Sequence, residues 1–164
     1  MSNEIWAPIL ETCGKYEVST MGRVRRAATQ QCLRPKKHVA GYASVNLKRP
    51  GGTVLTRLVH RLVALTFLPR ELRREMVDHI DGNRTNNQLS NLRFATLSQN
   101  SMNRRINNST TGVKGVQRLR NGRYSAVIGV NRKRIFLGYY NDLEEATRVI
   151  TEARRRWHGD YASY

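Results

Sequence analysis

A short stretch near the middle of the chain holds residue types that suit metal-assisted hydrolysis. Asp78 and His79 are adjacent, and Asn91 and Asn100 follow with eight residues between them. One oxygen ligand on a strand and another on a helix can hold a divalent ion, and an imidazole beside that ion can take a proton from water. Asn and Asp are also common turn residues, so it is the four residues as a set, and no single one of them, that suit metal-assisted phosphodiester hydrolysis.

Two short strands and a helix are expected to bring these four residues together. Residues 77–80 and 92–96 have the apolar and β-branched composition of short strands, and an Asp-Gly turn signal follows the first of them. Thr96 or Ser98 can cap a helix that carries Asn100. A hairpin packed against this helix would gather the four side chains at one place.

These residues resemble the signature of the HNH nucleases, which have the ββα-metal fold. Asp78-His79, Asn91 and Asn100 match its three parts, with Asn in place of the last His of the family name, and residues 59–64 (Val-His-Arg-Leu-Val-Ala) are similar to the phage and intron homing branch. The resemblance implies His79 as general base, Asn91 as the residue that orients it, and Asp78 and Asn100 as ligands of one divalent ion. Mg²⁺ or Mn²⁺ is expected, because these ligands are oxygens.

The charge of the chain indicates a polyanionic partner. There are 29 Lys and Arg against 12 Asp and Glu, for a net charge of +17. No acidic residue occurs from Val18 to Arg70 or from Ser101 to Asn141, and these blocks flank the site. A nucleic acid could lie across both blocks; the alternative is a basic surface that only serves solubility. Phosphate contacts are expected from four arginines near the site: Arg84, Arg93, Arg104 and Arg105.

Other classes of protein fit the sequence poorly. The chain has 164 residues and no apolar run long enough to span a bilayer. Its N-terminus lacks the basic start and apolar core of a signal peptide, so we expect a protein of the cytosol, that of the host cell if a phage encodes it. Cys13 and Cys32 form no CxxC pair, which predicts free thiols and no structural zinc. Neither a membrane partner nor a small-molecule cofactor is expected.

Residues 1–57 have the pattern of a basic, β-rich module. Trp6, a Tyr-Glu-Val-Ser run and a Gly-Arg-Val-Arg run resemble the NUMOD4-like module found before the nuclease of homing endonucleases, which implies a DNA-contacting element; a structural cap is the alternative. Its candidate DNA ligands are Arg23, Arg25, Lys36 and Lys37. Residues 58–67 then predict a helix from apolar positions spaced at i, i+3, i+4, i+7 and i+8. His60 lies off that face, so we expect it at the surface or beside the site and leave it out of the catalytic set.

The C-terminal part predicts a further small domain. Residues 107–111 form a polar linker, either a flexible tether or an arm that crosses a DNA groove. Residues 115–118, 123–130 and 134–138 alternate as strands, and a helix is expected to begin after Asp142. Three strands and a helix make an α+β mini-domain.

This segment resembles the AP2 DNA-binding domain. Its Thr-Gly-Val-Lys-Gly-Val, Arg-Tyr-Ser-Ala-Val-Ile and Phe-Leu-Gly-Tyr-Tyr runs carry the resemblance, which implies that the sheet lies in the major groove. The side chains expected on the outer face are Lys114, Gln117, Arg118, Arg123, Ser125, Val127, Arg134 and Phe136. Val127 and Gly129 stand where the plant-type pattern has charged base readers, so we expect phosphate contact more than base readout.

The whole sequence therefore predicts an α+β protein with three parts: a module at 1–57, an HNH core at 58–106, and, after the linker at 107–111, an AP2-like domain at 112–164. The expected function is a site-specific DNA endonuclease of the homing type that nicks double-stranded DNA as a monomer. A DNA-binding regulator with an inert HNH core is the main alternative. The charge also leaves an RNA-binding protein open.

Overall fold

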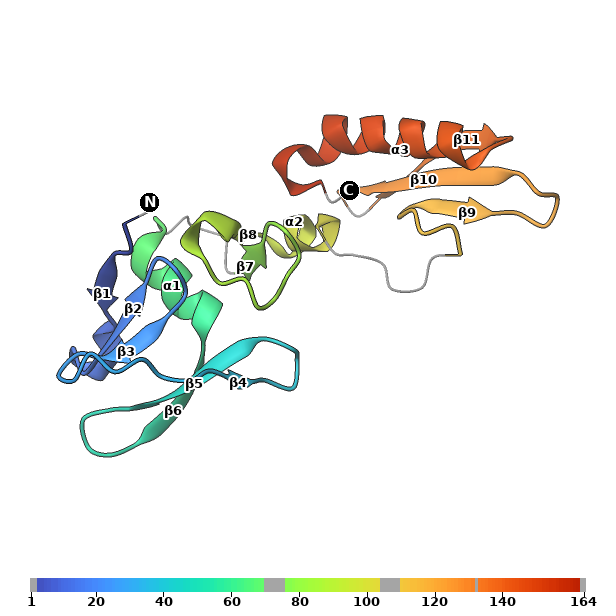
Figure 1. Cartoon of the computed structure of the whole chain (residues 1–164). Coiled ribbons are helices and arrows are strands. Elements are labelled where there is room, and N and C mark those ends of the chain that lie inside the picture. Colours follow the sequence, from blue (N-terminus) through green and yellow to red (C-terminus); the bar gives the residue numbers. More distant parts are fainter. Residues whose placement is uncertain (1–2, 70–75, 104–109, 132, 163–164) are drawn as a thin grey trace. The chain divides into compact units, whose positions relative to one another are not determined.

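The computed structural model in Figure 1 describes residues 3–69, 76–103, 110–131 and 133–162. The chain forms two compact units, Met1–Thr96 and Leu97–Tyr164. Small antiparallel sheets and a few helices build both units, which confirms the predicted α+β class. Arg104, Arg105 and linker residues 107–109 lie outside the described residues.

The first unit contains three small sheets and one longer helix. The first sheet has the order β1-β2-β3, the second β4-β5-β6, and the third is the hairpin β7-β8. The elements are β1 (Trp6–Pro8), η1 (Leu10–Thr12), β2 (Tyr16–Ser19), β3 (Val24–Arg26), β4 (Lys36–Lys37), β5 (Ala43–Lys48), β6 (Val54–Leu58), α1 (Val59–Phe67), β7 (Met76–His79), η2 (Leu89–Asn91) and β8 (Leu92–Ala95). The predicted strands at 77–80 and 92–96 correspond to β7 and β8, and the predicted helix at 58–67 corresponds to α1.

One hydrophobic core joins the predicted N-terminal module to the predicted nuclease. Val18 and Leu47 from the first two sheets pack in the same cluster as Val59 and Val63 of α1 and Leu92 of β8. All but Leu92 are fully buried, and Leu92 is 4% exposed. The division expected after residue 57 therefore does not separate two cores. The three-part division by function stays a prediction.

Helix α1 holds this unit together because its apolar positions are spaced for one buried face. It follows β6 directly, and it ends at Phe67, two residues before Pro69, as the restriction on residues before proline predicts. It contacts β2, β5, β6, β7 and β8. The site hairpin therefore packs against a helix that also contacts strands of both N-terminal sheets.

The second unit is a sheet covered on one face by a long helix (Figure 1). Its elements are α2 (Leu97–Met102), β9 (Val116–Arg118), β10 (Tyr124–Val130), β11 (Lys133–Tyr140), α3 (Leu143–His158) and η3 (Gly159–Tyr161), with the strands in the order β11-β10-β9. Ala126 and Ile128 of β10 pack on Ala146, Ile150 and Ala153 of α3. The predicted strands and helix of this segment are confirmed, although the helix with Asn100 belongs to this unit.

The start of α3 is capped as its sequence predicts. The Asp142 side chain accepts a hydrogen bond of 2.7 Å from the backbone N–H of Glu145, which satisfies one of the N–H groups left open at a helix start. Glu144 and Glu145 lie in the first turn, and Arg155 and Arg156 in the last, so the charges also favour the helix dipole.

A β-bulge in β11 changes which side chains reach the outer face of this sheet. Ala126 pairs with Gly138 but Val127 pairs with Phe136, so Leu137 is the extra residue. Phe136 and Tyr139 consequently lie with ring centroids 4.8 Å apart, and both are more than half exposed. Simple alternation would have placed Tyr139 on the face opposite Phe136.

Two further features concern expectations from composition. Cys13 and Cys32 are both free thiols and both exposed. Within the described ranges, no helix combines the length and the apolar character needed to cross a membrane.

Candidate active site

The hairpin β7-β8 places Asp78 directly opposite Arg93. Asp78 is only 5% exposed, and its Oδ2 accepts hydrogen bonds from Arg93 Nε at 2.9 Å and from Arg93 Nη2 at 2.8 Å. A buried carboxylate is stable as an ion when a guanidinium pairs with it in this way. Arg93 thus holds the candidate metal ligand in place, and its expected phosphate contact stays a prediction.

His79 ends β7 and lies beside aromatic rings that come from two other segments. The His60 ring of α1 meets it edge-on at a centroid distance of 5.0 Å, and the Tyr42 ring stacks beside it at 6.0 Å. Tyr42 and His60 are themselves 4.7 Å apart. Since His79 is 5% exposed, these rings fix where its imidazole lies.

His60 lies buried beside the site. Of the two positions expected from the helix pattern, at the surface or beside the site, the structure has the second. It is 5% exposed, and among the described residues no hydrogen bond reaches its Nδ1. Burial lowers the pKa of His60 to about 4, and the charges of His79 and Arg61 lower it in the same direction. His60 is therefore neutral at pH 7 and adds no positive charge beside His79.

Asn91 organises the loop between the two strands. Its Oδ1 accepts from the Asp81 N–H at 3.0 Å, and its Nδ2 donates to Asp81 Oδ1 and to the Asn86 carbonyl, both at 2.9 Å. Slight burial raises the pKa of Asp81, but hydrogen bonds from Asn86, the Asn83 backbone and Asn91 lower it overall. The side-chain bonds of Asn91 thus fix the loop, and its expected action on the His79 ring stays a prediction.

A hydrogen bond to the His79 ring comes from a residue outside the predicted set. Asn87 Oδ1 lies 3.1 Å from His79 Nε2, and both residues are buried. The sequence offers only a weak signal for it, because Asn87 is one of several Asn in a turn-rich loop. Asn100 lies on α2 in the second unit, so its pairing with Asp78 stays a prediction.

The donor chemistry at Asp78 fits a hard divalent ion. The expected protein ligands are one carboxylate and one amide oxygen, and Mg²⁺ is commonly bound by one or two carboxylates with water and phosphate oxygens completing its shell. Among the residues that the structure describes, no group of three His, Cys, Asp or Glu side chains is placed to hold a metal. The expected oxygen ligands are therefore of the type that Mg²⁺ takes in proteins.

Several expected DNA ligands of the first unit already have partners within the protein. Arg23 pairs with Glu4, and Arg25 Nε lies 2.6 Å from Glu17 Oε2. Both guanidinium groups also lie over the Trp6 ring, at 5.5 and 4.0 Å from its centroid. Lys36 and Lys37, in contrast, form the short exposed strand β4.

Arg84, in the hairpin loop, contacts the segment before β5. Its Nη1 donates to the Ala40 carbonyl at 2.8 Å, and its guanidinium lies 5.0 Å from the centroid of the Tyr42 ring. The side chain thus links the nuclease loop to the N-terminal module, and its expected phosphate contact stays a prediction.

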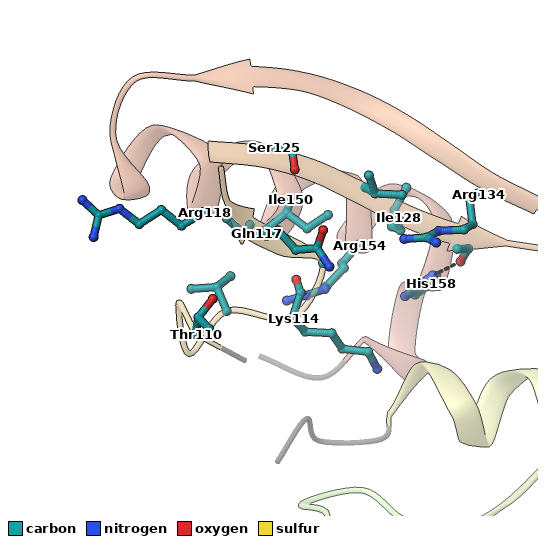
Figure 2. A pocket seen from close by; sticks show the side chains of 15 residues that line it. Thr110, Lys114, Gln117, Arg118, Ser125, Ile128, Arg134, Ile150, Arg154 and His158 are labelled. Atoms are coloured by element: carbon teal, nitrogen blue, oxygen red, sulfur yellow. Dashed lines mark hydrogen bonds between the residues drawn. The ribbon is translucent and has the colours of Figure 1, made fainter. Parts of the chain in front are cut away.

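In the second unit, the expected DNA ligands fall on the outer sheet face and around a basic pocket. Figure 2 shows this pocket, of about 540 Å³, beside β9 and β10. Its polar lining includes Lys114, Gln117, Arg118, Arg134, Arg154 and His158, and no acidic residue lines it within the described part. The lining therefore suits an anion.

Three of the predicted outer-face residues have more specific surroundings. Lys114 Nζ donates to the carbonyls of Ser101 and Met102 at the end of α2, at 3.1 and 2.7 Å. Ser125 is 9% exposed, and its expected contact with DNA from the outer face stays a prediction. Arg123 remains exposed, with its guanidinium 5.6 Å from the Tyr139 ring centroid.

Comparisons with known proteins match two regions of the chain. Residues 57–102 match a family described as HNH endonuclease, and residues 4–48 match the NUMOD4 motif. DNA endonuclease I-HmuI of Bacillus phage SP01 is 34% identical over 114 residues, which are 70% of this chain and 64% of the relative. An uncharacterized HNH endonuclease, L247 of Acanthamoeba polyphaga mimivirus, is 36% identical over 68% of this chain and 29% of the relative.

Two further matches extend this result. Protein 3.8 of Escherichia phage T7 is 35% identical over 54% of this chain and 74% of the relative. A solved structure, "DNA binding and cleavage by the HNH homing endonuclease I-HmuI", aligns with a TM-score of 0.55 and 36% identity, and covers 60% of this chain and 56% of that one. The chain thus spans less than two thirds of I-HmuI and of L247.

Proposed function

Because the chain belongs to the HNH endonuclease family, we propose that it hydrolyses phosphodiester bonds of double-stranded DNA with one divalent metal ion. The observation that carries this proposal is the hairpin β7-β8, which holds Asp78 and His79 side by side, each 5% exposed. Asp78 pairs with Arg93, and His79 packs against the rings of His60 and Tyr42. A metal ligand and a base in adjacent positions suit attack by water on a phosphate.

Asp78 and Asn100 would hold the ion, which is Mg²⁺ or Mn²⁺ in this proposal. When bound, such an ion supplies electrostatic stabilisation of the phosphate and of the departing oxygen. His79 takes a proton from water, the water oxygen forms a bond to phosphorus, and the bond from phosphorus to the leaving oxygen breaks. The leaving oxygen takes its proton from solvent. Asn91 holds the loop beside His79, so that the imidazole keeps its place during the reaction.

In this proposal the basic surfaces supply the affinity for DNA and the choice of the cleavage site. The matching solved structure concerns DNA binding and cleavage by a homing endonuclease, which supports duplex DNA as the substrate of this chain. We assign contact with DNA phosphates to Lys36 and Lys37 of the first unit and to Arg118, Arg123 and Arg134 of the second. A single site of this kind cuts one strand at a time, so a monomer would nick.

The test is a nicking assay on supercoiled plasmid with the purified chain. Open-circular product is expected with Mg²⁺ or Mn²⁺, and none with excess EDTA, while DNA binding measured in EDTA persists. Asp78→Ala and Asn100→Ala should each weaken the dependence on metal. Full cleavage in excess EDTA would remove the ion from the mechanism, and a requirement met by zinc alone would overturn the choice of metal.

A DNA-binding regulator with an inert core is the second candidate function. It shares the basic surfaces, so binding alone does not separate the two. Intact Asp78, His79, Asn91 and Asn100 favour the nuclease. Absence of nicking under every divalent ion, together with tight and salt-dependent binding, would favour the regulator.

A further inference from the structure

We infer that Asn87 is the positioning residue of His79, and that the N-terminal module holds Asn87 in place through the turn at Thr20–Gly22. This inference rests on the proposed nuclease function, because it concerns the base of that same site. It gives the module of residues 4–48 a part in the active site, in addition to its expected contact with DNA.

The amide of Asn87 selects one tautomer of His79. Asn87 Nδ2 donates to the Thr85 carbonyl at 3.2 Å, so the amide oxygen is the atom that faces His79 Nε2 at 3.1 Å. An amide oxygen only accepts hydrogen bonds, and Nε2 must therefore carry the proton of the neutral ring. Nδ1 is then the nitrogen with the lone pair, and it is the atom that would take a proton from water.

The turn between β2 and β3 packs closely against the backbone of Asn87. Gly22 has φ +77°, and a Cβ built there would lie 2.7 Å from the Asn87 carbonyl oxygen and 2.8 Å from its Cβ. The Thr20 carbonyl accepts a hydrogen bond of 2.8 Å from the Leu89 N–H, a little further along the same loop. The turn itself is braced by Ser19, whose Oγ accepts from the backbone N–H groups of its neighbours. The loop that carries Asn87 thus closes only against a glycine.

A second loop of the same module reaches another side of the imidazole. Tyr42 stacks beside His79 and tilts against His60, and Arg84 of the nuclease loop covers the Tyr42 ring. His79 is therefore held by its hydrogen bond to Asn87 and by rings that the module supplies or covers. Residues 57–102 alone lack both the Gly22 turn and the Tyr42 ring.

The kinetic test compares variants of Asn87 with one of its neighbour Asn86. Asn87→Ala should lower the single-turnover cleavage rate at saturating DNA by roughly ten- to a hundredfold, as for other residues that orient a reacting ligand, while DNA affinity stays unchanged. Asn87→Asp keeps an accepting oxygen and should recover most of the rate. Asn86→Ala, whose side chain bonds Asp81 instead, should stay within about threefold of the parent chain. A rate for Asn87→Ala equal to the parent rate would overturn the inference.

A glycine pair tests the part of the module. Gly22→Ala and Gly14→Ala impose similar backbone strain, because their φ values are +77° and +76°, but a Cβ at Gly14 meets nothing within 4 Å. Gly22→Ala should lower the cleavage rate well below that of Gly14→Ala at a temperature where both are folded. Equal rates for the two variants would remove the turn from the positioning of His79.

An NMR measurement decides the inference even if the chain proves not to cut DNA. Long-range ¹H–¹⁵N spectra of the imidazole nitrogens, assigned with His79→Gln, should show the Nε2–H tautomer in the parent chain and a mixture in Asn87→Ala. An Nδ1–H tautomer in the parent, or no change in Asn87→Ala, would overturn the role of Asn87. Absence of cleavage by the parent would instead count against the proposed nuclease function, and leave this spectrum to judge the positioning.

Discussion

The two units carry a similar excess of positive charge but place it differently. The first has 16 Lys and Arg against 7 acidic residues, and the second has 13 against 5. In the first, Arg25, Arg57 and Arg93 lie on the carboxylates of Glu17, Glu11 and Asp78. Of the residues described in the second, Arg118, Arg123 and Arg134 have no carboxylate within ion-pair distance. The net charge of a unit alone therefore does not show which of its basic side chains could contact DNA.

The paired arginines of the first unit serve its architecture. Arg57 donates to both carboxylate oxygens of Glu11 at 2.7 Å, and this hydrogen bond lowers the pKa of Glu11. Arg25 of β3 donates a hydrogen bond to Glu17 of β2 and lies over the Trp6 ring of β1, so it links the three strands of this sheet. Arginines used in this way contribute to folding, whereas Arg118, Arg123 and Arg134 of the second unit have no such carboxylate partner among the described residues.

Removing the exposed arginines of the second unit should have the largest effect. With Arg118, Arg123 and Arg134 all changed to Ala, the log–log salt slope of DNA binding should flatten by about 2.7 units, at about 0.9 per phosphate contact, and affinity near physiological salt should fall roughly a hundredfold. Fluorescence anisotropy of a labelled duplex across a salt series measures both. The pair Arg23→Ala and Arg25→Ala is the matched control, and an equal flattening by that pair would break the comparison.

Acid should weaken the first unit through His60. Its pKa is lowered from 6.5 to about 4, so its contribution to stability is present above pH 6.5 and is lost as the pH falls towards 4. The total is roughly 3 kcal/mol by the usual conversion. Urea unfolding at pH 7 and pH 5, followed by Trp6 fluorescence in a Trp157→Phe background, should show this loss. His60→Phe should reduce it, and an identical pH dependence in parent and variant would contradict the buried, neutral imidazole.

The smallest expected effect is on stability at one arginine of the first unit. Arg25→Ala removes the bond to Glu17 and the contact with Trp6, and should lower the free energy of unfolding by about 1 kcal/mol. The salt slope of DNA binding should not change. A large loss of affinity with unchanged stability would show that Arg25 contacts phosphate, as its sequence context alone suggested.

Most elements could be predicted from the sequence because their patterns are local. Alternation in residues 123–130 and the apolar stripes of residues 59–67 and 143–153 each specify one buried face, and the structure has β10, α1 and α3 there. The HNH and NUMOD4 resemblances of the first unit are confirmed by the family matches, and the AP2 resemblance of residues 112–164 stays a prediction. Local pattern and motif thus predicted the hairpin that carries Asp78 and His79.

What could not be predicted depends on segments that meet only in the fold. Asn87 reaches His79 because Gly22, from a distant turn, lets the loop close. The Tyr42 ring packs against His60, which is buried. The apolar pattern of helix α1 gives no information about the distant segment that carries Tyr42. Tyr139 lies on the outer face because of the β-bulge in β11. A glycine within a strand, here Gly138, can indicate a bulge, but it does not tell which residue of the partner strand each residue pairs with.

In the proposed function, His79 acts on the water that attacks the phosphate and does not contribute to DNA binding. The most direct measurement is single-turnover cleavage of duplex DNA by the parent and by His79→Ala, with affinity measured separately in EDTA. Cleavage should fall at least about a hundredfold in the variant, as for loss of a general base, while the dissociation constant is unchanged. Equal cleavage by both chains, or a loss explained wholly by weaker binding, would contradict the assignment of His79 as the base.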